Sequence, residues 1–268
     1  MFELNYYLIV SFSILLFAIS KSGFSGGGLA LISVTLLSIT YGPLTAIAIL
    51  MPMLIICDVI ALYLNRKYFD YKILWSIAPF SLLGVIIGTI LFKFLNLSMI
   101  SIFIGMISLI YVLFNYLIVD TKLKKIPFYG SKSFWGALAG FTSFALHSGG
   151  LPLNIYFMSI YNKKVQFVAG VVFSIALVNL FKLIPYFYLE ILNLEKLFSY
   201  LIFSPVAVIG VILGHWMNSK LSDKSFFLII NFFIIVASLR LMYLGIICLL
   251  YTSPSPRDLS TSRMPSSA

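Results

Sequence analysis

The stretch Lys21-Ser-Gly-Phe-Ser-Gly-Gly-Gly28 places a cation and four glycines between two apolar runs. A later stretch resembles it, because Gly149-Gly-Leu-Pro-Leu153 repeats the pattern of Gly27-Gly-Leu-Ala-Leu31. A sharper repeat lies outside these turns: Pro79-x4-Gly84-Val-Ile-x-Gly88 recurs as Pro205-x4-Gly210-Val-Ile-x-Gly214. Both repeats occur in the same order along the chain, so the sequence predicts two related halves.

Composition assigns the chain to a membrane. Of its 268 residues, 61% are hydrophobic and 10% are charged, whereas a soluble domain carries roughly 25% charged residues. The formal net charge is +10, but the basic residues stand in short loops between apolar runs. They therefore indicate membrane topology and not a nucleic-acid surface. Cys57 and Cys248 have no CxxC partner, which argues against a disulfide framework or a zinc knuckle.

The apolar runs divide into short ones and ones that can cross a bilayer, whose hydrocarbon core of about 30 Å takes roughly 20 helical residues. In each half, two short runs flank a glycine turn and three long runs follow. The runs of the first half are Leu4 to Ser20, Leu29 to Ile39, Leu44 to Leu64, Ile73 to Leu95 and Ser98 to Val119. Those of the second half are Ser133 to Ala145, Leu151 to Ile160, Phe167 to Leu189, Lys196 to Asn218 and Ser225 to Leu250.

These runs predict an all-α polytopic membrane protein made of two inverted repeats, each a glycine-turn helical hairpin plus three transmembrane helices. If each hairpin enters and leaves by one side, each half crosses an odd number of times, and the halves must be inverted. The expected units are a first repeat at 1–119, a cytoplasmic linker at 120–132 and a second repeat at 133–250. Residues 251–268 are rich in Ser and Pro, and we expect a disordered tail of non-native origin there.

Loop charge predicts the orientation in the cell membrane. Placing residues 65–72 in the cytoplasm brings eleven Lys or Arg residues to that side and leaves two, Lys93 and Lys196, outside. Under the positive-inside rule, this split puts the linker inside and both termini outside. The first apolar run has no preceding basic residue and no cleavage site after it, so we expect it to be retained.

The glycine turns are the predicted ligand site. Irregular backbone at the bilayer midplane is tolerated only where protein buries it or where it lines a polar cavity. The helices that start after the two turns present unpaired N–H groups and a dipole that favour an anion, and Lys21 adds positive charge. The predicted substrate-binding residues are Lys21, Gly23, Ser25, Gly26, Gly27, Gly28, His147, Ser148, Gly149, Gly150, Asn154 and Tyr156.

Each of these residues also has a structural interpretation. The glycines allow helices to pack closely, while Lys21 or Tyr156 can reach a membrane interface. His147 is either a hydrogen-bonded structural group or a protonatable member of the site. The sequence leaves both interpretations open.

Three further polar residues, Asp58, Asn179 and Lys182, are candidates for coupling or gating, with a proton or a sodium ion as the coupled species. Asp58 and Lys182 occupy nearly equivalent places in the two halves. Because inversion puts them at opposite depths, we do not expect a direct salt bridge between them.

At these residues the chain resembles the sulfite exporter TauE/SafE family of membrane anion transporters. The first half matches in the Lys21 to Gly28 turn, Gly42-Pro43, Pro52, the helix with Asp58, the basic loop from Arg66 to Asp70, Gly84 and Gly88. The second half matches in His147 to Pro152, Tyr156, Lys182-x-x-Pro185-Tyr186, Gly210 and Gly214. Ala30, where proline is common, and Leu151, which separates the glycines from Pro152, depart from the family pattern.

The resemblance covers nearly all of Leu4 to Gly245 and implies transport of small sulfur-containing anions, sulfite or organosulfonates, across the cytoplasmic membrane. Alternatives are a passive anion channel, a non-transporting accessory protein and a membrane enzyme. The sequence has no HExxH, CxxC, carboxylate cluster or nucleophile elbow, so no catalytic residue, metal or cofactor is predicted. The expected partners are a small inorganic or organic anion and membrane lipid, with no nucleic acid, and the oligomeric state stays open.

The orientation can be tested by labelling single cysteines in whole cells. We expect cysteines within Asp120 to Lys132 to react only from the cytoplasm and those within Leu189 to Glu195 only from outside, because the basic loops stay inside. Labelling of both loops from the same side would contradict the inverted arrangement.

Overall fold

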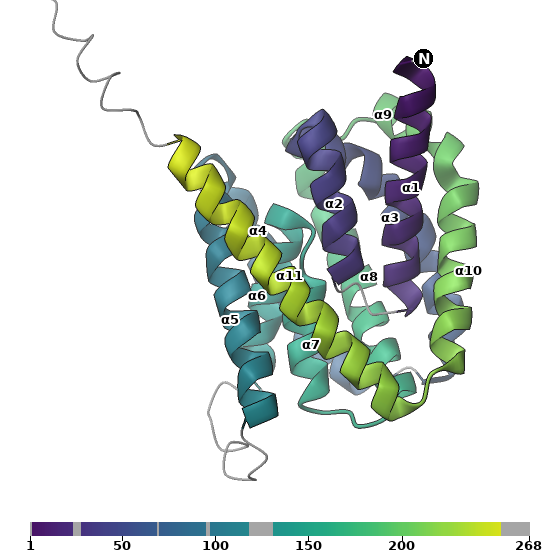
Figure 1. Cartoon of the computed structure of the whole chain (residues 1–268), viewed down its shortest axis with the longest axis vertical. Coiled ribbons are helices and arrows are strands. Elements are labelled where there is room, and N and C mark those ends of the chain that lie inside the picture. The colour runs from purple at the N-terminus through teal and green to yellow at the C-terminus, as the bar shows by residue number, and fades with distance from the viewer. Residues whose placement is uncertain (1, 24–27, 69, 95–96, 118–130, 253–268) are drawn as a thin grey trace, which may run out of the picture.

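The structure is a computed structural model of the chain, and it describes residues 2–23, 28–68, 70–94, 97–117 and 131–252. In those ranges every regular element is a helix (Figure 1). The α-helices are α1 (Phe2–Gly23), α2 (Gly28–Tyr41), α3 (Pro43–Asn65), α4 (Tyr71–Leu91), α5 (Leu97–Leu117), α6 (Lys132–Leu146), α7 (Gly150–Met158), α8 (Lys164–Tyr188), α9 (Leu194–Ser199), α10 (Ser204–Lys220) and α11 (Asp223–Thr252). Short 3-10 turns extend α3, α4 and α9 at Arg66–Tyr68, Phe92–Phe94 and Tyr200–Phe203.

Six segments are long and apolar enough to cross a membrane, which confirms a multi-pass membrane protein. They are α1, α3, α4, α8, the continuous stretch from α9 through α10, and α11. Large apolar side chains point outward from these helices, among them Trp75 and Ile90 on α4 and Ile209 on α10. An apolar exterior of this kind is suited to contact with lipid acyl chains.

The two pairs of helices around the glycine turns differ in length. α1 has 22 residues and continues through Lys21 to Gly23, whereas its counterpart α6 has 15 and α7 has 9. The first run is thus long enough to span, and longer than the sequence predicts. Two other limits also differ. A 3-10 turn separates α9 from α10, and α11 includes Tyr251 and Thr252, which the sequence assigned to the tail.

Side-chain caps explain where two of the helices start. The Asp70 carboxylate accepts hydrogen bonds from the backbone N–H groups of Lys72 and Ile73 at 3.0 and 3.3 Å and caps α4. The Ser131 hydroxyl accepts from the N–H of Phe134 at 3.3 Å and caps α6. Each cap satisfies N–H groups that a helix start leaves unpaired.

The repeated glycines lie where a helix of one half of the sequence packs against a helix of the other half. On α4, a side chain at Gly84 would collide with the carbonyl oxygen of Ala137 on α6. On α10, a Cβ at Gly210 would lie 2.6 Å from the Cβ of Ala18 on α1. The first half therefore packs its repeat against the second half, and the second half packs its own against the first (Figure 1).

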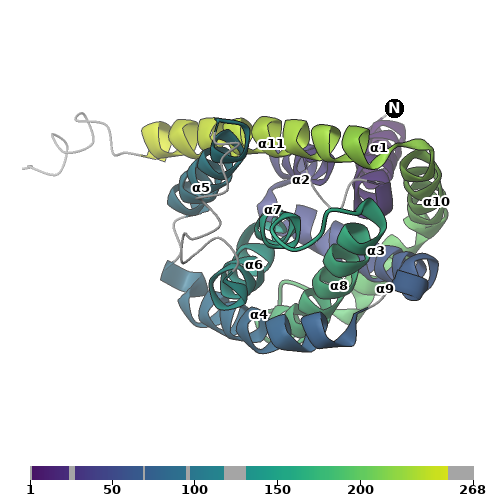
Figure 2. The same cartoon turned by 90° about the horizontal axis from the view of Figure 1, so that it is seen from below.

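A second exchange occurs where α5 of the first half packs against α11 of the second. A Cβ at Gly105 of α5 would lie 2.6 Å from the carbonyl oxygen of Ser238, and one at Gly245 of α11 would lie 2.6 Å from that of Ser98. α4 and α11 occupy opposite sides of the bundle (Figure 2). α3 packs against α8 between them, and both helices are largely buried.

Basic connections meet at one end of the bundle. The Lys164 ammonium group at the start of α8 donates hydrogen bonds to the carbonyl oxygens of Asn218, at 2.7 Å, and Leu221. These bonds connect α8 to the segment between α10 and α11. Next to them is an open cavity of about 590 Å³ that includes Lys67, Asp70 and Tyr161. Burial, together with the Asp70 carboxylate, raises the pKa of Tyr161 to about 12. The phenol therefore stays uncharged well above physiological pH.

The glycine contacts can be tested with Gly84→Ala. Because the added methyl group meets backbone of α6, the two helices must separate, and we expect a loss of about 1 to 3 kcal/mol of stability. The readout is the thermal melting midpoint of the protein in detergent. Leu83→Ala, on the exposed face of the same helix, is the matched control and should change stability by less than about 0.5 kcal/mol. If the two variants have the same melting midpoint, Gly84 is not required for close packing of α4 against α6.

Candidate functional site

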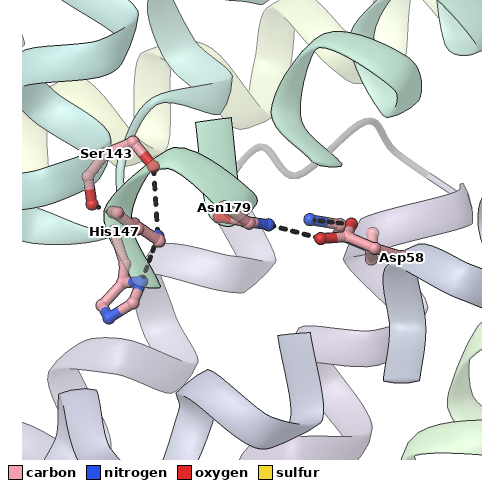
Figure 3. Close-up of polar contacts among 6 residues, drawn as sticks. Asp58, Ser143, His147 and Asn179 are labelled. Atoms are coloured by element: carbon pink, nitrogen blue, oxygen red, sulfur yellow. Dashed lines mark hydrogen bonds and ion pairs between the residues drawn. The ribbon is translucent and has the colours of Figure 1, made fainter. Parts of the chain in front are cut away.

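The last turn of α1 brings a buried ion pair into the bundle. The Lys21 ammonium group lies 2.6 Å from Oδ1 of Asp58 on α3, and Lys21 is only 3% exposed. The second carboxylate oxygen, Oδ2, accepts a hydrogen bond from the Asn179 amide of α8 at 2.6 Å (Figure 3). Lys21 therefore does not extend to a membrane interface. The carboxylate connects α1, α3 and α8.

A second cluster surrounds Lys182, one helical turn beyond Asn179 on α8. Nζ of Lys182 donates to the Ser143 hydroxyl at 3.1 Å and to the Ser143 carbonyl at 3.4 Å. It also lies 2.9 Å from Nδ1 of His147. These polar partners are uncharged groups, so no carboxylate in the described ranges forms a salt bridge with Lys182.

His147 is held in an uncommon backbone conformation that directs it to this cluster. Its φ of 52° lies in the left-handed region, which glycine usually occupies at a helix C-terminus. Its N–H donates to the Ser143 carbonyl at 3.2 Å and closes the last turn of α6. The ring nitrogen Nε2 is buried and has no hydrogen-bond partner. Strain of this kind is typical of functional sites.

The two clusters occupy equivalent places in the two halves. His147 follows Lys21 at the same offset that separates Gly84 from Gly210, and Lys182 follows Asp58 within two residues of it. In the first half a cation on α1 meets a carboxylate on α3. In the second half an imidazole at the end of α6 meets a cation on α8. The position that carries the anion in one half carries the cation in the other.

A cavity of about 20 Å³, here called the central cavity, lies between these clusters. Its volume is close to what one water molecule requires. The first residue of α7, Gly150, reaches its wall, so a helix N-terminus borders it. Its lining consists of Phe17, Lys21, Ala30, Leu54, Ser143, His147, Gly150, Ile175, Asn179 and Lys182.

The structure brings together part of the predicted site. Lys21, His147, Gly150, Asn179 and Lys182 line the central cavity, and Asp58 binds two of them. Ser148, Gly149, Asn154 and Tyr156 are not among the residues of its lining. Gly23 ends α1 and Gly28 begins α2, while Ser25, Gly26 and Gly27 lie outside the described residues.

The residues away from the lining have structural surroundings of their own. The Ser148 N–H donates to the Thr142 carbonyl at 3.3 Å. A Cβ at Gly149 would lie 2.7 Å from the carbonyl oxygen of Ala139, which favours the packing interpretation for this glycine. The ring of Tyr156 contacts that of Phe157 edge-on, with centroids 5.0 Å apart. Both polar side-chain atoms of Asn154 are buried without a hydrogen-bond partner.

The predicted site left out two residues of the second cluster, Ser143 and Tyr186, although Tyr186 belongs to a motif that carries the family resemblance. Ser143 accepts from Nζ of Lys182 through both its hydroxyl and its carbonyl oxygen, and the Tyr186 hydroxyl donates to the Phe144 carbonyl at 2.6 Å. Ser143 stands one turn before His147, and Tyr186 one turn after Lys182. Because helical residues four apart share a face, that spacing was the available signal.

The fold and the cavity define a multi-pass helical membrane protein with buried cations around a small polar cavity. The family model described as sulfite exporter TauE/SafE matches residues 11–241, and the chain belongs to this family of membrane transporters. This match confirms the resemblance found in the sequence. No curated protein and no solved structure matches the chain.

The buried ion pair can be tested with Asp58→Asn. This change leaves the Lys21 ammonium group buried without a counter-ion, and we expect a loss of about 3 to 5 kcal/mol of stability. The double variant Lys21→Met, Asp58→Leu should recover most of this loss, because no buried charge remains. Thermal melting in detergent provides the measurement. If the single and double variants have the same melting midpoint, the two side chains are not energetically coupled.

Proposed function

We propose that the protein is a carrier of small sulfur-containing anions, sulfite or organosulfonates, across the cell membrane. The observation that carries this proposal is the buried Lys182 side chain, which has no carboxylate among its polar partners. The family match supports the substrate class. Direct ligands of the anion are proposed to be Lys21, His147, Ser143 and Lys182, with the Gly150 N–H at the start of α7.

Charge accounts for the preference for an anion. Two lysine side chains line the central cavity, and the Asp58 carboxylate behind them already binds Lys21. An ammonium group without a counter-ion is costly in a low-dielectric interior. An anion in the cavity would supply the missing negative charge, and the N-terminal dipole of α7 would favour it further. A cation would meet repulsion from both lysines.

The size of the central cavity favours a carrier over a channel. A cavity of about 20 Å³ is close to the size of one water molecule, whereas a sulfonate has at least five non-hydrogen atoms. The helices around the cavity must therefore separate to admit the anion. Rocking of one repeat against the other is the usual way in which inverted-repeat transporters do this.

The partner exchange between α4–α6 and α10–α1 supports the inverted-repeat scaffold. Related halves that pack each repeat motif against the other half give the pattern expected of a pseudo-two-fold arrangement. We propose repeats at 1–119 and 133–250 with the linker 120–132 between them. The basic end of the bundle, which includes Lys67 and Lys164, would face the cytoplasm.

The function can be tested with purified protein. Methanesulfonate, sulfite and sulfoacetate should raise the melting midpoint in detergent, because a ligand that binds only the folded state stabilises it. In proteoliposomes, unlabelled methanesulfonate on one side should drive counterflow of the labelled anion. Counterflow requires a carrier, so anion flux without it would indicate a channel. Absence of both binding and flux for this panel would overturn the proposal.

Substitutions of Lys21 test the location of the site. Lys21→Gln removes the charge and leaves the Asp58 carboxylate unpaired, whereas Lys21→Arg keeps the charge. We expect Gln to weaken methanesulfonate affinity more than Arg does, by about 1 to 3 kcal/mol, the range for hydrogen bonds to charged groups. Calorimetry on folded protein gives the affinities. Unchanged affinity in Lys21→Gln would place the anion elsewhere.

A further inference from the structure

We propose that the carrier moves one proton with each monovalent anion, and that Lys182 and His147 hold this proton. This inference rests on the proposed function and identifies both the coupled species and the charge class of the substrate. The geometry that carries it is the difference between the two equivalent pairs. Asp58 neutralises Lys21, but nothing of opposite charge among the described residues neutralises Lys182.

The charged groups near Lys182 can be named element by element. α1 presents Lys21, α3 presents Asp58, and α6 ends at His147. The other cavity-lining residues, which come from α1, α2, α3, α6, α7 and α8, carry no charge. The net charge of the described cavity is therefore set by one proton on the Lys182–His147 pair.

The requirement for a neutral cavity determines when the Lys182–His147 pair carries the extra proton. A carrier that reorients through the bilayer with an uncompensated charge in its interior must meet the cost of moving that charge into low dielectric. Without an anion, the cavity is neutral when Lys21 pairs with Asp58 and Lys182 carries no extra proton. With a monovalent anion, the cavity is neutral when Lys182 is an ammonium ion. Both reorienting forms are then neutral.

The contact between the two side chains offers a route for the proton. In the form without the anion, the His147 Nδ1–H donates to the lone pair of the Lys182 amine, a contact of 2.9 Å. A hydronium ion transfers a proton to Nε2, which has no partner, and leaves as water. The Nδ1 proton then moves to Nζ: the Nε2–H and Nζ–H bonds form and the Nδ1–H bond breaks. His147 stays neutral overall, and Lys182 becomes an ammonium ion beside the anion. Release reverses these steps.

The same balance predicts the substrate class. A monovalent sulfonate or hydrogensulfite leaves the loaded cavity neutral, whereas a dianion such as sulfate leaves a net negative charge. Monovalent anions are therefore the substrates, and a dianion is excluded unless it binds in a protonated form.

The test uses full-length wild-type protein in proteoliposomes that contain a pH-sensitive dye. The probe is labelled methanesulfonate, which remains monovalent across the experimental pH range, so any pH effect belongs to the protein. An inward methanesulfonate gradient should acidify the interior by one proton per anion. The uptake rate should not change when the membrane potential is clamped at different values. Protein-free liposomes give the background.

The outcomes separate this inference from the proposed function. Methanesulfonate counterflow or uptake without acidification overturns proton coupling and leaves the carrier function intact. Uptake that follows the membrane potential overturns it too. If neither methanesulfonate nor hydrogensulfite is exchanged, the proposed function fails and the inference fails with it.

Lys182→Arg gives a sharper version of the test. Arginine keeps its proton under all assay conditions, so this variant should bind the anion but could not return empty without an uncompensated charge. We expect net methanesulfonate uptake to fall by at least about tenfold, while counterflow exchange continues. Lys164→Arg, on the same helix but outside the central cavity, should keep proton-coupled uptake. If Lys182→Arg acidifies the liposome interior as much as wild-type protein does, the assignment of the proton to Lys182 is wrong. If this variant does not fold, the acidification measured with wild-type protein decides the question of proton coupling.

Discussion

A buried carboxylate that must serve several partners sets the architecture of the site. Asp58 forms an ion pair with Lys21 through one oxygen and accepts a hydrogen bond from Asn179 through the other, so one charged group connects three helices. Charges removed from water in a bilayer persist only when they are paired and hydrogen-bonded. The length of α1 follows from this requirement. The helix continues to Gly23 because a lysine in its last turn has a counter-ion to reach.

The second half places a different pair of side chains at the corresponding positions. His147 and Lys182 take the places of Lys21 and Asp58, but they form a pair without a negative member. The left-handed conformation of His147 is the local cost of this arrangement. The two pairs occupy related places in the sequence, but only the first contains a negatively charged member.

The sequence predicted the helical membrane architecture and most of the charged residues, since apolar run length and rare intramembrane charges are strong signals. It identified Lys21, His147 and Lys182, but it could not say that Asp58 would bind Lys21. That pairing depends on how helices distant in sequence pack. The roles of the glycines in the turns were harder to predict. Gly149 proved to be in close contact with α6, a relation that glycine content alone cannot distinguish from ligand binding.

The exchange of partners between the halves also bears on biosynthesis. α1 rests on α10, and α4 rests on α6, so the earliest helices have their main neighbours in segments translated much later. Such long-range contacts form only after the intervening chain has been inserted, and incomplete chains expose helix faces that later segments cover. Until α10 is made, the small-residue face of α1 around Ala18 has only lipid or an insertion factor to contact. Assembly of this protein is therefore a late step, completed after translation of the final helices and not half by half.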